Sequence, residues 1–132
     1  MPAGQCHCGQ VGYEVQGEPA HSALCHCIDC RRCAGAPAVG WTAFKSEQFA
    51  LKRGEPALYR SSEHAERYFC GACGTGLYYI NETVLSGLVD VQTATLDDPD
   101  AYPPRVHIQM ADAIGWEATA DALPKFDRYP GP

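Results

Sequence analysis

Short stretches in which hydrophobic and polar residues alternate make up much of the chain. Val11, Tyr13 and Val15 alternate with Gly12 and Glu14, which is the pattern of a half-buried strand. The same alternation predicts further short strands at residues 39–43, 49–51 and 106–108. Two pairs of strands are separated by a few polar residues and are predicted to form hairpins, 58–60 with 66–69 and 77–80 with 84–86.

Helical structure is predicted only for residues 28–34, and only for one or two turns. Short strands joined by turns that contain glycine and proline are typical of an all-β domain. Trp41 and Trp116 are expected in the core or in the wall of a pocket, and Phe126 is expected to hold an irregular tail against the protein. The length of 132 residues predicts a single domain over residues 1–132.

Charge and composition narrow the possible functions. Ten Lys and Arg residues against sixteen Asp and Glu residues give a formal net charge of −6. An acidic chain without a basic run is not expected to bind nucleic acid or an anionic membrane. No stretch reaches the ~20 apolar residues that span a bilayer. The N-terminus has neither the basic nor the apolar segment of an export signal, so we expect a cytoplasmic protein.

The eight cysteines fall into three tight groups, at residues 6–8, 25–33 and 70–73. A disulfide framework is typical of small secreted proteins, whereas this chain is long enough to form a core without cross-links. Cysteines at C-x-C and C-x-x-C spacing are better suited to a shared metal ion than to bonding each other. Zinc is preferred because it accepts four thiolates in a tetrahedron, and because the spacings typical of iron–sulfur clusters do not occur here.

The third group ends in Cys73-Gly74, and a glycine in this place can adopt a positive φ. This conformation lets the backbone wrap around a metal ion and point N–H groups at the sulfur atoms. The first group is followed by Gly9 in the same way. Joining the two groups predicts a closed, structural metal site made of Cys6, Cys8, Cys70 and Cys73.

The middle group offers Cys25, Cys27 and Cys30 as three ligands on one short segment. A tetrahedral metal ion would keep one position open for water or substrate, which is the arrangement of a catalytic site. Cys33 lies one helical turn after Cys30. It could be a fourth ligand that makes the site structural, a nearby free thiol, or the partner in a transient disulfide. The spacing leaves these three roles open.

Polar residues near these groups have less specific patterns. Arg31 and Arg32 could neutralise the thiolates or bind a substrate carboxylate, or could simply be solvated. His26 lies between two candidate ligands and is expected to point outward. Asp97 and Asp98 are expected to cap a turn rather than to act as acid and base.

Three motifs occur in order along the chain: GQCHCG at residues 4–9, CHCIDCRR at 25–32 and FCGACGT at 69–75. Together they resemble the glutathione-dependent formaldehyde-activating enzyme family, which also includes the centromere protein V domain. The resemblance implies a mainly β fold, the β-tent, in which packed antiparallel sheets are stapled by zinc and helix is scarce. It also implies two zinc ions per chain: a structural ion on Cys6, Cys8, Cys70 and Cys73, and a second ion beside the substrate pocket on Cys25, Cys27 and Cys30.

The activity that gives the family its name joins formaldehyde to glutathione and forms S-hydroxymethylglutathione, which is a carbon–sulfur lyase reaction in reverse. The resemblance therefore implies a zinc-dependent, lyase-like enzyme whose partner is a small-molecule thiol or aldehyde. The alternative is a zinc-stabilised binding module without chemistry. The two hypotheses differ at Cys33, which would close the second site in a binding module and would lie away from the metal ion in an enzyme.

Overall fold

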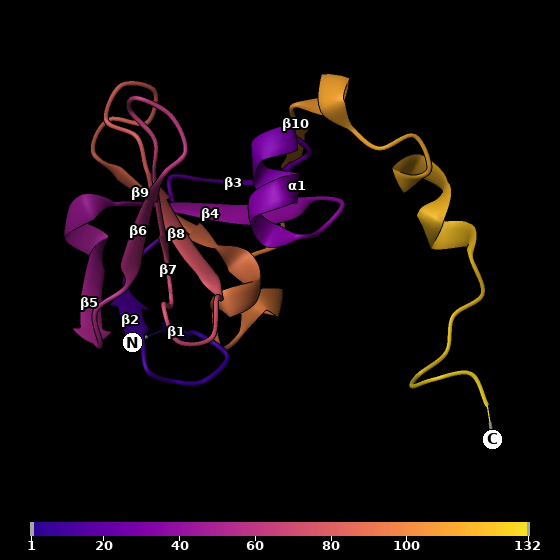
Figure 1. Cartoon of the computed structure of the whole chain (residues 1–132), viewed down its shortest axis with the longest axis horizontal. Helices are drawn as coiled ribbons and strands as arrows, with labels where there is room; N and C mark the ends of the chain where they lie inside the picture. Colours follow the sequence, from indigo (N-terminus) through magenta and orange to yellow (C-terminus); the bar gives the residue numbers. More distant parts are fainter. Residues whose placement is uncertain (1, 132) are drawn as a thin grey trace.

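The computed structural model describes residues 2–131, which form two β-sheets and one short α-helix (Figure 1). The smaller sheet has the order β1-β2-β5, with bounds Ala3–Gln5, Gly12–Val15 and Phe49–Arg53. The larger sheet has the order β10-β3-β4-β9-β8-β7-β6. Its strands are β3 (His21–Cys25), β4 (Val39–Lys45), β6 (Ala57–Arg60), β7 (Glu66–Phe69), β8 (Gly76–Ile80), β9 (Leu88–Gln92) and β10 (Val106–Ile108).

The prediction of a mainly β fold with packed antiparallel sheets is confirmed. All strand pairs are antiparallel except β10 and β3, which run parallel. The helix α1 covers Ile28–Ala34, as predicted, and ends at Gly35. Short 3-10 helices lie at Ser46–Gln48, Thr93–Thr95, Pro99–Ala101, Met110–Asp112 and Glu117–Ala122.

One face of the larger sheet packs against the smaller sheet and forms the main core. Tyr13 and Val15 of β2 meet Phe44, Leu77 and Val91 of the larger sheet, and all five side chains are buried. Burial of one such aliphatic side chain contributes roughly 1.5–3 kcal/mol. The alternation along these strands therefore has a direct cause, since every second residue enters this core.

The opposite face of the larger sheet lies under α1. Cys25 and Trp41 on this face pack with Cys30 of the helix in a second, smaller cluster. Strand register places Tyr79 of β8 opposite Asp90 of β9, so these two side chains share the face with Trp41. This face positions the candidate site.

One predicted strand is in the wrong place, because residues 84–86 form part of a turn. Asn81 Oδ1 accepts hydrogen bonds from the backbone N–H groups of Thr83 and Val84 at 3.1 and 3.2 Å. The turn continues to Gly87, which has a φ of 75°. The strand β9 therefore begins only at Leu88.

The tail after Leu123 is irregular, as predicted, but the predictions that Phe126 anchors it and that Trp116 lies in the core or a pocket wall are wrong, whereas Trp41 is buried as expected. Phe126 and Trp116 are 59% and 57% exposed, so neither side chain is part of a core. The backbone hydrogen bonds given for residues 113–131 connect only close neighbours in the sequence. Figure 1 shows the same segment, in gold and yellow, extending away from both sheets.

No helix in the described part of the chain has the length and apolar character needed to cross a bilayer.

Candidate metal centres and the adjoining cavity

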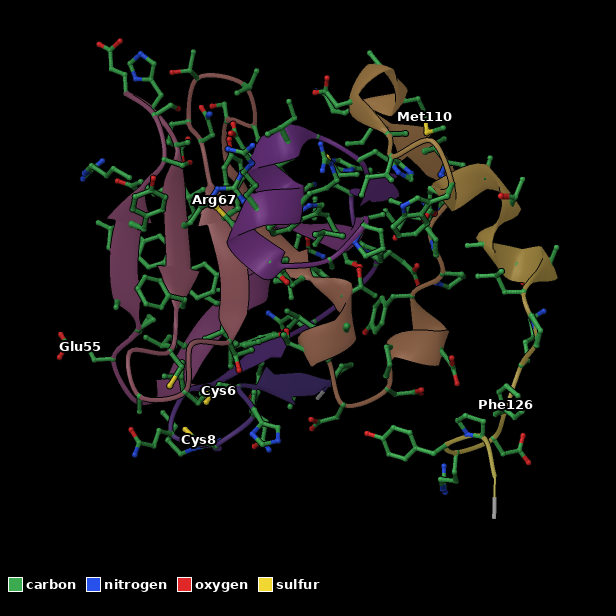
Figure 2. All side chains as sticks on the ribbon, turned by 45° about the vertical axis from the view of Figure 1, so that its right-hand side comes forward. Cys6, Cys8, Glu55, Arg67, Met110 and Phe126 are labelled. Atoms are coloured by element: carbon green, nitrogen blue, oxygen red, sulfur yellow. The ribbon has the colours of Figure 1, made fainter. Side chains whose placement is uncertain are left out.

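The first and third cysteine groups meet at one end of the sheets. The sulfur atoms of Cys6, Cys8, Cys70 and Cys73 all lie within 4.8 Å of one another. Cys8 Sγ is 3.6 Å from Cys6 Sγ and 3.7 Å from Cys70 Sγ. Cys6 and Cys70 are buried, whereas the other two are exposed. Figure 2 shows Cys6 and Cys8 together in the loop that follows β1. This cluster could hold a metal ion, and it joins the two groups that the sequence paired.

Two glycine turns shape this first cluster. Gly9 and Gly74 have φ values of 81° and 84°, as the sequence predicts for knuckles around a metal ion. Their N–H groups donate to the carbonyl oxygens of Cys6 and Cys70 at 3.1 and 2.8 Å. The Thr75 hydroxyl, 3.2 Å from Cys73 Sγ, lowers the pKa of that thiol to about 5. The loop thus favours a thiolate, which is the form that binds a metal ion.

The second cluster forms where β3 passes into α1. The sulfur atoms of Cys25, Cys27 and Cys30 lie within 4.8 Å of one another and could hold a metal ion. Cys27 caps the helix, because its Sγ accepts a hydrogen bond from the Cys30 N–H at 3.2 Å. Burial raises the pKa of the Cys25 and Cys30 thiols. These buried sulfur atoms therefore need a nearby positive charge to become thiolates.

The remaining residues of the middle group lie elsewhere. Cys33 is exposed and is not part of the cluster of three cysteines found among residues 2–131. It lines a separate cavity of about 620 Å³ together with Arg32. Arg31 is half-buried on α1, and its side chain is not among those lining either cavity beside the helix.

His26 does not point outward as predicted but is completely buried. Its Nε2 atom lies 3.0 Å from His107 Nδ1, and its backbone N–H donates to the Ile108 carbonyl at 3.1 Å. Both partners belong to β10. His26 therefore connects the loop of the second cluster to the edge strand of the larger sheet.

Arg67 on β7 is a site residue that sequence reasoning missed. Its Nη2 atom lies 3.8 Å from Cys30 Sγ, and its guanidinium carbon lies 4.9 Å from the centre of the Tyr79 ring. Its Nε–H donates to Ser61 Oγ at 3.1 Å. Figure 2 shows Arg67 beside α1. The guanidinium thus supplies the positive charge that the buried Cys30 thiolate needs.

Replacing Arg67 with glutamine is expected to weaken cobalt binding at the second cluster by about tenfold or more, because outer groups that stabilise metal ligands have effects of this size. Spectroscopic titration with Co²⁺ of protein that lacks metal only at the second cluster measures this change. Arg105→Gln removes the same charge from an exposed position and is expected to leave cobalt binding unchanged. Equal affinities in the Arg67 variant and the wild type would show that the guanidinium does not support the cluster.

A cavity of about 640 Å³ opens beside the second cluster. Its wall includes all three cysteines, the aromatic rings of Trp41 and Tyr79, and the charged side chains of Arg67 and Asp90. Burial raises the pKa of Asp90 to about 7. Asp97 and Asp98, which were considered from the sequence, are exposed and do not line this cavity.

The fold and these centres define a mainly β protein in which two cysteine clusters could hold metal ions. A model of the family described as glutathione-dependent formaldehyde-activating enzyme matches residues 1–112, and the chain belongs to this family. The resemblance noted from the cysteine motifs is thereby confirmed.

The proteins that are similar to the chain include a curated relative and a solved structure. A Schizosaccharomyces pombe protein described as an uncharacterized lyase is 28% identical over 113 residues, which are 75% of this chain and 82% of that protein. The crystal structure of a Rhodobacter sphaeroides protein matches with a TM-score of 0.64 and 24% identity, covering 80% of this chain and 98% of the other. This second likeness shows a shared fold.

Proposed function

We propose that the protein is a zinc-dependent enzyme of the carbon–sulfur lyase type that forms and cleaves adducts between a small thiol and an aldehyde. The observation that carries the proposal is the cluster of Cys25, Cys27 and Cys30, which opens directly onto the cavity of about 640 Å³. Membership of the formaldehyde-activating family supports the reaction class, and so does the description of the yeast relative as a lyase.

The geometry of the cysteines fits zinc. In a tetrahedral site with zinc–sulfur distances of ~2.3 Å, neighbouring sulfur atoms lie about 3.8 Å apart. The Sγ–Sγ separations of 3.6 and 3.7 Å in the first cluster are close to this value. Four thiolates would complete the coordination there, so we assign Cys6, Cys8, Cys70 and Cys73 to a structural zinc ion. Three thiolates at the second cluster would leave one position free.

The residues around the second cluster have distinct roles in this proposal. A zinc ion held by the three cysteines would lower the pKa of a substrate thiol and favour its thiolate. Arg67 offsets the negative charge that several sulfur atoms bring into a buried place. Trp41 and Tyr79 provide an apolar wall that limits access of water to the reacting thiol and aldehyde. A cavity of this size accommodates a small molecule.

The position of Cys33 favours an enzyme over a binding module without chemistry. A purely structural second site requires a fourth ligand, and Cys33 was the candidate for it. Its exposed side chain instead belongs to the wall of the other cavity. A metal ion held by Cys25, Cys27 and Cys30 could therefore bind a substrate thiol from the cavity that these three cysteines line.

The wild-type protein is expected to accelerate the exchange between ¹³C-formaldehyde and its glutathione adduct, and Cys30→Ser is expected to lower this acceleration by about 100-fold. The serine hydroxyl remains neutral and is a poor zinc ligand, so the second site loses its metal ion. Exchange spectroscopy by ¹³C NMR measures the rate, and metal analysis measures zinc per chain.

Cys33→Ser is the matched control, because it removes a thiol from the same helix but outside the cluster. We expect this variant to keep both the activity and the zinc content. The proposed function fails if the zinc-loaded wild type accelerates adduct formation neither with glutathione nor with a series of smaller thiols.

A further inference from the structure

Asp90 occupies an unusual position for a carboxylate. It lies in the middle of β9, between the core residues Val89 and Val91, and is only 7% exposed. Because successive residues of a strand point to opposite faces, the two valines enter the main core and Asp90 lies on the face under α1. There it lines the same cavity as the second cysteine cluster.

Among residues 2–131, no hydrogen bond to Asp90 Oδ1 accounts for the burial of this carboxylate. Its Oδ1 atom is buried and has no hydrogen bond within residues 2–131. A buried acid without a partner is costly, and structural acids are normally paired. An unpaired carboxylate in the wall of a cavity can instead bind a polar group of a ligand that enters the cavity.

Strand register defines the surroundings of Asp90. Its neighbours across the sheet are Tyr79 on β8 and Ala43 on β4. Arg67 lies one strand beyond Tyr79, and His21 lies one strand beyond Ala43. The other titratable groups in the cavity wall are the three clustered cysteines, Asp29 and Asp112. Asp90 is thus placed on the sheet and in the wall of the cavity that the cysteine cluster also lines, with the cation Arg67 two strands away.

We propose that Asp90 is a catalytic residue that carries the proton of the thiol–aldehyde reaction. This inference rests on the proposed function. As the substrate thiol forms the thiolate that attacks the aldehyde carbon, its S–H bond breaks and the proton passes to the Asp90 carboxylate. A carbon–sulfur bond forms, the carbonyl π electrons move to oxygen, and the same proton passes from Asp90 to that oxygen. Asp90 ends ionised, as it began, and the reverse sequence cleaves the adduct.

The environment of Asp90 suits this role. A group that both accepts and returns a proton works best when its pKa is close to the working pH. Burial raises the pKa of Asp90 to about 7, so both of its protonation states are populated near neutral pH. An exposed aspartate, with an ordinary pKa of ~3.9, would be too weak a base to accept the thiol proton well.

Asp90→Asn is expected to lower the enzyme-dependent exchange between ¹³C-formaldehyde and S-hydroxymethylglutathione by about 100-fold at neutral pH, because general acid–base catalysis contributes effects of this size. The variant should keep the wild-type zinc content. Asp100→Asn removes a carboxylate from an exposed 3-10 turn and is expected to keep full activity. In the wild type the pH profile should change near pH 7, and this feature should be absent from the Asp90 variant.

The wild-type protein also provides a test that does not depend on the folding of a variant. Proton transfer by Asp90 in the reaction should make the rate differ between H₂O and D₂O. An active wild type without this effect, or an Asp90→Asn variant with wild-type rate and pH profile, overturns the role of Asp90 and leaves the proposed function intact. An inactive wild type overturns both proposals.

Discussion

Replacing Cys70 with serine is expected to remove one metal ion per chain and to leave the protein largely unfolded at 25 °C. Cys70 is buried in the first cluster and lies 3.7 Å from Cys8 Sγ, 62 residues away in the sequence. Structural zinc sites contribute ~10–16 kcal/mol in small domains, which equals or exceeds the net stability of most proteins. Loss of one ligand therefore removes a large part of the stability. Metal analysis and urea unfolding followed by circular dichroism measure the two effects.

Cys33→Ser is the control for this experiment, because Cys33 is exposed and lies outside both clusters. Its free energy of unfolding is expected to lie within about 0.5 kcal/mol of the wild-type value, as is usual for surface substitutions. The structural assignment of the first cluster is wrong if Cys70→Ser retains two metal ions and wild-type stability.

Asp90→Asn is expected to change how the free energy of unfolding depends on pH. The pKa of Asp90 is about 7 in the folded protein, above its ordinary value of 3.8. The folded state therefore keeps this proton between the two values while the unfolded state loses it, so the wild type loses stability as the pH rises. Between pH ~4.5 and ~8, the free energy of unfolding of the wild type should fall by about 3 kcal/mol more than that of the variant.

Urea unfolding of both proteins at several pH values measures this difference, and metal binding largely cancels because both proteins retain the same cysteines. Asp100→Asn, at an exposed position, should follow the wild-type curve. Parallel curves for the wild type and the Asp90 variant would show that burial does not raise the pKa of Asp90. This measurement needs no substrate, so it tests the cost of the buried acid separately from its catalytic role.

The cysteine clusters could be predicted from the sequence because each is built from ligands that are close neighbours in the chain. In the first cluster, each pair of cysteines has its own glycine turn, the pair Cys6 and Cys8 as well as the pair Cys70 and Cys73. Only the association of the two pairs had to be inferred. The helix at 28–34 was predictable for a similar reason, since short-range features define both of its ends.

Arg67 and Asp90 could not be predicted in the same way, because their role depends on strand register. They are brought to one face by the pairings of β7 with β8 and of β8 with β9. The sequence predicted the second strand of this hairpin at 84–86, whereas β9 begins at Leu88. With the strand placed too early, Asp90 fell outside it and the alternation of polar and apolar residues around Asp90 was not recognised. A lone acid between two valines in a correctly placed strand was the only local signal.

The first cluster also determines an order of events during synthesis. Cys6 and Cys8 leave the ribosome first, and Cys70 follows Cys8 by 62 residues. At ~5–20 residues per second, the early pair waits roughly 3–12 s for its partners. The three ligands of the second cluster emerge almost together, so they can bind a metal ion before the first cluster is complete. The centre proposed for chemistry would then be assembled on an unfinished chain, and the closure of the first cluster would be a late step that joins the loop after β1 to the loop after β7.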